Sequence, residues 1–114
     1  MSSRPRGIER VTSSVVLSAI NALNRRDRDG WFGLFVPEAE FSDDGITRDL
    51  VEWCDEEFFG RYRARIISID RVEDGSLTFY ATYHSDKYGD FQTFWKFALS
   101  GDKIAKLDVG ATSY

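Results

Sequence analysis

The sequence has one cysteine, one histidine and two prolines in 114 residues, and it lacks any long apolar run. The single cysteine, Cys54, cannot form a disulfide within the chain, so cysteine usage does not point to an oxidising compartment. The first residues lack the apolar segment of a secretion signal. No stretch approaches the ~20 apolar residues that span a bilayer. We therefore expect a cytoplasmic protein with no membrane partner.

Motifs for cofactors and metals are also missing. The chain contains no phosphate-binding loop, dinucleotide fingerprint or nucleophile elbow. The lone His84 has no histidine partner for a metal site, and we expect Cys54 to lie in the core of a helical segment. A net charge of −4 offers no basic face for phosphate groups, which argues against nucleic acid as a partner. We therefore expect no cofactor, no metal and no nucleic acid.

Aromatic residues, by contrast, are abundant, with nine Phe, five Tyr and three Trp. They concentrate in residues 77–109, where apolar and polar residues alternate in three runs. In the central run, 91–99, Trp95 and Phe97 fall on one face and Phe94 on the other. A period of two with bulky residues on one side is typical of a half-buried strand, so these runs predict a curved sheet with an aromatic face.

The pattern along the chain predicts helices first and strands later. We expect a flexible arm over residues 1–7, followed by a single domain over residues 8–114. Its predicted elements are a helix over 8–27, a short helix from Asp29 that Pro37 terminates, a strand over 39–42, a helix capped by Thr47 and ended by Gly60, and strands over 63–72, 77–85, 91–99 and 104–109. This order predicts an α+β fold in which three N-terminal helices pack on a curved, mostly antiparallel sheet.

Together with the element order, three segments resemble the nuclear-transport-factor-2-like superfamily, and within it the SnoaL-like group. They are Asn24–Asp29, Gly33–Gly45 and Phe97–Ile104, and the resemblance covers about residues 11–111. It implies a cone-shaped domain with a deep apolar pocket, in a group whose members often dimerise through the outer sheet surface. Those members include ketosteroid isomerases, polyketide cyclases, dehydratases and non-enzymatic binding modules, so the fold leaves the function open.

Asp43 is the candidate catalytic residue, because the resemblance to ketosteroid isomerases places their general-base aspartate near it. A carboxylate at the mouth of an apolar pocket can have a raised pKa, which suits proton transfer. The alternative is that Asp43, Asp44 and Gly45 only form a turn. The first helix also lacks the tyrosine that isomerases use as a hydrogen-bond donor, since its inward positions are apolar. Dehydratases of this superfamily use several histidines, and this chain has only His84.

The residues predicted to contact a ligand lie on the apolar face of the sheet and on the facing helices. They are Trp31, Phe35, Trp53, Phe58, Phe79, Tyr83, Thr93, Trp95 and Phe97. Tyr83, Thr93 and Asp43 would serve as polar anchors among the rings. The alternative is that these aromatic residues form only a core.

Two functions remain open. The first is a small-molecule-binding domain for an apolar ligand, with or without isomerase- or cyclase-type acid–base chemistry on a carbonyl compound. The second is a non-catalytic interaction module that forms a homodimer through the outer sheet face, around Tyr80, Thr82, His84 and Phe94.

Overall fold

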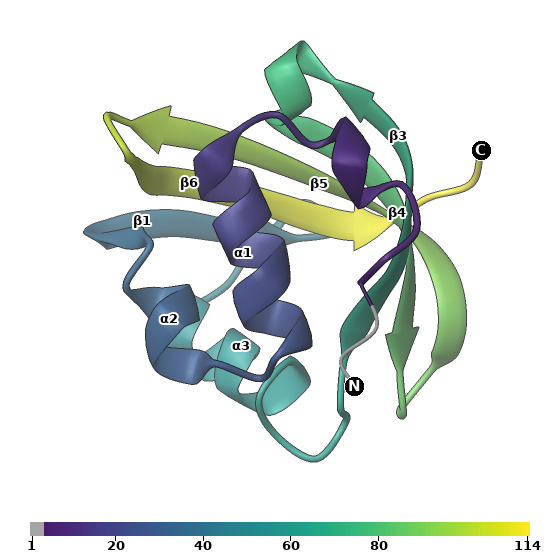
Figure 1. The fold of residues 1–114 in the computed structure, drawn as a ribbon. Helices are drawn as coiled ribbons and strands as arrows, with labels where there is room; N and C mark the ends of the chain where they lie inside the picture. The colour runs from purple at the N-terminus through teal and green to yellow at the C-terminus, as the bar shows by residue number, and fades with distance from the viewer. Residues whose placement is uncertain (1–3) are drawn as a thin grey trace.

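The computed structural model describes residues 4–114 and consists of a curved sheet with helices packed on its inner face (Figure 1). The elements are the single-turn helix η1 (Ile8–Arg10), α1 (Ser14–Asn24), α2 (Arg28–Phe32), β1 (Phe35–Asp43), β2 (Ile46–Thr47), α3 (Leu50–Glu57), β3 (Arg65–Glu73), the single-turn helix η2 (Asp74–Ser76), β4 (Thr78–Ser85), β5 (Gly89–Ser100) and β6 (Lys103–Ala111). The predicted α+β class, with three helices on a mostly antiparallel sheet, is confirmed. None of the helices in the described part is long and apolar enough to cross a membrane.

The six strands follow the order β2-β1-β6-β5-β4-β3, and β1 lies parallel to β6 while the other neighbouring strands are antiparallel. Directly paired residues share a face of a sheet. Phe79 pairs with Trp95, and Trp95 pairs with Val109, so these three residues form a row across the inner face. Tyr80 pairs with Phe94 on the outer face, where both side chains are half-buried.

The predicted helix over residues 8–27 is too long, because the chain is extended at Val11 and α1 starts only after Ser13. The Ser13 hydroxyl caps α1 by accepting a hydrogen bond from the backbone N–H of Val16. The Ser76 hydroxyl accepts from the backbone N–H groups of Thr12 and Ser13, at 3.1 and 2.8 Å. These contacts hold the extended segment against η2 and separate η1 from α1.

Two predicted boundaries around β1 are also wrong. Pro37 does not end a helix but lies within β1, exposed and in the stretch where the β1–β6 register is irregular. A proline is tolerated there because the ladder is interrupted. Thr47 does not cap α3, since it lies in β2 and pairs with Ser42 of β1. The cap is Asp49, whose carboxylate accepts from the backbone N–H of Glu52 at 2.9 Å.

Part of the predicted arm is paired with the sheet. The Arg6 backbone N–H donates to the Ile67 carbonyl at 3.2 Å, and its carbonyl accepts from the Ile69 N–H at 2.6 Å. Pro5 is buried next to it. Residues 1–3 of the predicted arm lie outside the described residues.

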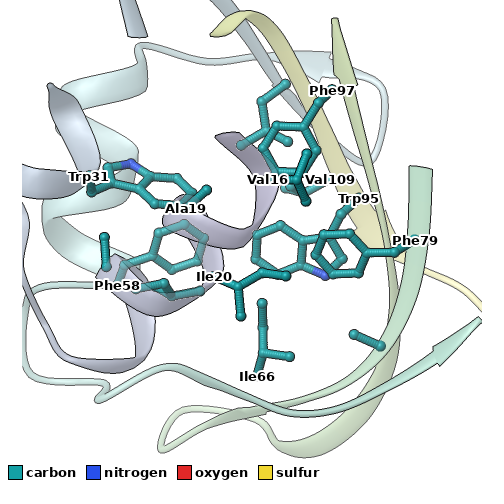
Figure 2. Close-up of a cluster of buried hydrophobic side chains, with 14 of the residues drawn as sticks. Val16, Ala19, Ile20, Trp31, Phe58, Ile66, Phe79, Trp95, Phe97 and Val109 are labelled. Atoms are coloured by element: carbon teal, nitrogen blue, oxygen red, sulfur yellow. The ribbon is translucent and has the colours of Figure 1, made fainter. Parts of the chain in front are cut away.

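The core lies between α1 and the inner sheet face, and Figure 2 shows Trp95 between Phe79 and Phe58. The Phe79 and Trp95 rings stack at 5.6 Å between centroids with an angle of 7° between their planes. Phe58, which follows α3, stacks on Trp95 at 5.8 Å. The buried residues of α1, among them Val16 and Ile20, cover these rings. This packing ties the end of α3 to the middle of the sheet.

Candidate functional site

A cavity of about 660 Å³ opens where α3, the β1–β2 turn, the β4–β5 hairpin and the end of β6 meet. Its lining combines aromatic rings with charged side chains. The residues are Asp43, Asp44, Arg48, Trp53, Glu56, Glu57, Phe58, Tyr83, Lys87, Tyr88, Phe91, Thr93, Trp95, Val109, Gly110 and Ala111. A cavity of this size and character is typical of small-molecule sites.

The structure divides the sequence-predicted contact residues into two groups. Trp53, Phe58, Tyr83, Thr93 and Trp95 line the cavity. The other four lie in the core and not in the lining: Trp31, Phe35, Phe79 and Phe97. Phe79 of the core group and Trp95 of the lining group lie on the same inner face of the sheet, so alternation along a strand cannot distinguish cavity lining from closed core.

Asp43 ends β1 and places its half-buried carboxylate in the cavity lining. Burial raises the pKa of this carboxyl, and repulsion from Asp44 raises it further. The Arg48 guanidinium and a hydrogen bond with Trp53 oppose this rise in pKa. Asp43 therefore sits where a carboxylate is more readily protonated than in water.

The turn after β1 depends on Asp44 more than on Asp43. Asp44 adopts a left-handed conformation with φ of 51°, and its carboxylate accepts from the backbone N–H of Ala111 at 2.9 Å. Gly110 makes this approach possible, because a Cβ there would lie 2.5 Å from Asp44 Oδ1. The bonds that fix the turn thus come from Asp44, which leaves the Asp43 side chain facing the cavity.

Tyr83 and Glu57 form the second polar group of the site. The Tyr83 hydroxyl donates to Glu57 Oε1 at 3.3 Å, and Tyr83 is only 4% exposed. Burial raises the pKa of Tyr83, and the neighbouring Glu57 carboxylate adds to this effect. Tyr83 therefore remains a neutral phenol that can donate a hydrogen bond.

The Thr93 hydroxyl, in the cavity lining, already makes two hydrogen bonds within the protein. It donates to the Ala81 carbonyl at 2.9 Å and accepts from Trp95 Nε1 at 2.8 Å. Thr93 and both of its partners are buried. Thr93 therefore orients the Trp95 ring, and its remaining capacity for a ligand is small.

Sequence reasoning missed several lining residues, notably Glu57, Phe91 and Tyr88. The acidic run of residues 55–57 is typical of the solvent-facing side of a helix, and residues 86–90 are typical of a turn. One signal for Glu57 was present: it lies four residues after Trp53, so both share a face of α3. Tyr88, at 63% exposed, carried no such signal because its position depends on how the hairpin folds over the cavity.

His84 lies on the outer side of β4 and is not part of the lining. Its Nε2 lies 2.7 Å from Asp86 and its Nδ1 2.6 Å from Asp90. These hydrogen bonds, Asp86 first, raise the pKa of His84. His84 thus bridges the two ends of the β4–β5 hairpin. Over residues 4–114, no three His, Cys, Asp or Glu side chains gather as a metal site would require.

The sequence matches no protein-family model and no curated protein. Solved structures do match. An NTF2-like protein of unknown function from Cytophaga hutchinsonii is 13% identical, with a TM-score of 0.67 over 98% of this chain and 95% of that chain. The Anabaena Orange Carotenoid Protein binding canthaxanthin is 18% identical, with a TM-score of 0.69 over 100% of this chain and 39% of that one. An M. tuberculosis LEH-like epoxide hydrolase is 15% identical, with a TM-score of 0.66 over 88% and 81%.

These likenesses define the fold as NTF2-like, a cone of helices on a curved sheet, as the resemblance implied. At such low identities they show the fold alone. The chemistry of the cavity must therefore be inferred from its own residues.

Proposed function

We propose that the cavity binds a small, largely apolar organic molecule. The observation that carries this proposal is an aromatic-walled cavity of about 660 Å³ that holds the half-buried Asp43 carboxylate and the Tyr83–Glu57 pair. Apolar walls supply affinity, and a few placed polar groups supply orientation. The similar Orange Carotenoid Protein, of which this chain covers 39%, binds canthaxanthin, a large apolar ligand.

A cavity-filling variant tests binding directly. Isothermal titration with 2-naphthalenemethanol, a neutral bicyclic probe, should give saturable binding to the wild-type protein. Ala111→Trp places a ring at the lining and should abolish that heat. Ala98→Trp, at an exposed position outside the lining, is the matched control and should bind normally. Absence of saturable binding to the wild type would remove the proposal.

We also propose that Asp43 exchanges a proton with the bound molecule at a carbon next to a carbonyl group. The Asp43 carboxylate accepts the proton as the C–H bond breaks, and the electron pair moves onto the carbonyl oxygen as an enolate. The Arg48 guanidinium, a donor in the same lining whose charge acts on Asp43, supplies the hydrogen bond to that oxygen which the first helix cannot provide. Protonated Asp43 then returns the proton to carbon.

Deuterium exchange measures this step without a known natural substrate. In D₂O, the protein should accelerate exchange of the α-protons of 2-tetralone, an apolar bicyclic ketone, as followed by proton NMR. Asp43→Asn should return the rate to that of buffer, while Glu52→Gln, on α3 but outside the lining, should not change it. A wild-type rate equal to that of buffer rejects the catalytic role and leaves ligand binding intact.

A homodimer through the outer sheet face is the remaining proposal. It is supported by the paired aromatic residues Tyr80 and Phe94, which lie half-buried on that face beneath the cations of Arg71 and Lys96. Sedimentation equilibrium should give a dimer mass for the wild type and a monomer mass for Thr82→Arg. Ser18→Arg, on the exposed side of α1, is the control. A monomeric wild type contradicts the proposal.

A further inference from the structure

One corner of the cavity is built from three rings set at steep angles. Phe91 lies edge-to-face with Tyr83, at 5.4 Å and 80°, and edge-to-face with Tyr88, at 6.2 Å and 90°. All three line the cavity, and they run from the buried Tyr83 to the exposed Tyr88 at its mouth. We refer to Tyr83, Phe91 and Tyr88 as the aromatic corner. Rings that face a common space from different directions offer their electron-rich faces to a cation.

A carboxylate completes the aromatic corner. Glu57 is half-buried in the same lining and accepts the Tyr83 hydroxyl at 3.3 Å. Among the described residues, the ion pairs do not include Glu57 or Asp43. A partly buried carboxylate without a close cation is stabilised by any cation that reaches it.

The whole lining carries an excess of negative charge. It contains four carboxylates, Asp43, Asp44, Glu56 and Glu57, against the two cations Arg48 and Lys87. Both cations are exposed at the rim. An anionic ligand would therefore meet repulsion, and a neutral one would leave Glu57 without an ion-pair partner.

The side chain of Lys87 already places a cation beside aromatic rings at the rim of the cavity. Its Nζ lies 5.1 Å from the centroid of Tyr88 and 5.1 Å from that of Tyr62. A hydrogen bond with Tyr88 raises the pKa of Lys87 most, and the Glu57 charge adds the smallest contribution. An ammonium group thus already lies against the outermost ring of the aromatic corner, while the space between the rings and Glu57 belongs to the cavity.

We propose that the cavity recognises a ligand with a positively charged nitrogen, an ammonium or methylated ammonium group attached to an apolar body. The nitrogen lies in the aromatic corner beside Glu57, and the apolar body lies over Trp95 and Phe58. Asp43, on β1, is separated from Phe91 by β6 and from Tyr83 by β6 and β5, and remains free for the other end of the ligand. This inference rests on the proposed function, because it names the charge of the molecule held in the same cavity.

Three probes of one shape test the charge. They are 2-naphthylmethylamine, which is cationic at neutral pH, 2-naphthalenemethanol, which is neutral, and 2-naphthoate, which is anionic. By isothermal titration we expect the amine to bind about tenfold more tightly than the alcohol, and the naphthoate to bind most weakly. The advantage of the amine should shrink as salt is added.

Two variants change the preference in opposite directions. Glu57→Gln keeps an acceptor for Tyr83 and should reduce amine affinity to that of the alcohol. Lys87→Met removes the competing ammonium and should raise amine affinity. The readout in both variants is the ratio of amine affinity to alcohol affinity, and Glu52→Gln, outside the lining, should leave both affinities unchanged. Equal binding of amine and alcohol overturns this inference but leaves the proposed function, whereas failure of all three probes to bind overturns both.

Discussion

The Tyr83 hydroxyl, on β4, donates a 3.3 Å hydrogen bond to Glu57 Oε1, at the last residue of α3. This bond connects the helical and sheet walls of the cavity. Phe58, the next residue, is 1% exposed and packs edge-to-face on Tyr83 at 6.2 Å. A polar contact at the surface of the cavity and an apolar one beneath it thus fix the same helix end.

Removing the hydroxyl should weaken this connection without removing the ring. We expect Tyr83→Phe to lower the free energy of unfolding by about 1 kcal/mol, because Glu57 can turn to water in the variant. Urea denaturation monitored by circular dichroism gives the value. Tyr88→Phe, at an exposed ring, should have no measurable effect. A larger loss for Tyr88→Phe would contradict this account of the two tyrosines.

The buried Thr93–Trp95 hydrogen bond predicts a stronger effect. Thr93→Val preserves shape but leaves the buried indole N–H of Trp95 without its acceptor, at 2.8 Å in the wild type. The expected loss of stability is about 1–3 kcal/mol. Thr93→Ser keeps the hydroxyl and should lose less. If urea denaturation ranks serine below valine, the methyl group and not the hydrogen bond dominates at this position.

His84 predicts a stability contribution that depends on pH. Its pKa is raised by Asp86 and Asp90, so its contribution is full below the unfolded pKa of about 6.5 and is lost as pH rises through the folded pKa. Relative to wild type, His84→Gln should therefore lower the melting temperature at about pH 5.5 and have little effect at about pH 9.

The single histidine makes this prediction easy to check. One imidazole resonance in the proton NMR spectrum should titrate with a pKa above the ordinary value. Asp102→Asn, in the exposed β5–β6 turn, is the control. It should not change the melting temperature at either pH or the titration of the imidazole resonance. A titration at or below pH 6.5 would contradict the bridging role of His84.

Asp43, like His84, makes the folded state less stable as pH rises, but substitution of Asp43 should raise stability where substitution of His84 lowers it. Its folded pKa is raised above 3.8, so the ionised carboxylate is penalised in the folded state at neutral pH, and the penalty disappears once both states are protonated. Asp43→Asn should thus increase the melting temperature at about pH 7 and give no gain near pH 3. Differential scanning calorimetry at the two pH values decides, and a stability loss at pH 7 would show that the charged form is stabilised.

The alternation of apolar and polar residues predicted the sheet well, because each strand has one inner and one outer face. Phe79 and Trp95 lie inside as expected, and Tyr80 and Phe94 lie outside. The starts of α1 and α3 were harder to predict, since several residues near each start could serve as the cap: Thr12, Ser13 and Ser14 before α1, and Thr47 and Asp49 before α3. The Ser76 contacts that end the η1 segment join residues more than sixty apart in sequence.

The cavity could be predicted only in part. Trp53, Tyr83 and Trp95 follow from the inner face, but depth along that face depends on where α1 stops covering it. The rest of the lining comes from the end of α3 and from the β4–β5 hairpin. These segments contribute Glu57 and Tyr88, which lie about thirty residues apart in sequence, to the same cavity. No local sequence pattern predicts that these two segments line the same cavity.

The three tryptophans allow the central claim, that the cavity is a ligand site, to be tested in one spectrum. Trp53 and Trp95 line the cavity, whereas Trp31 lies in the core outside its lining. During titration of ¹⁵N-labelled protein with 2-naphthalenemethanol, we expect the indole N–H signals of Trp53 and Trp95 to shift and saturate together while that of Trp31 stays in place. If no signal moves, or if all three move without saturation, the cavity is not a binding site and the account is wrong.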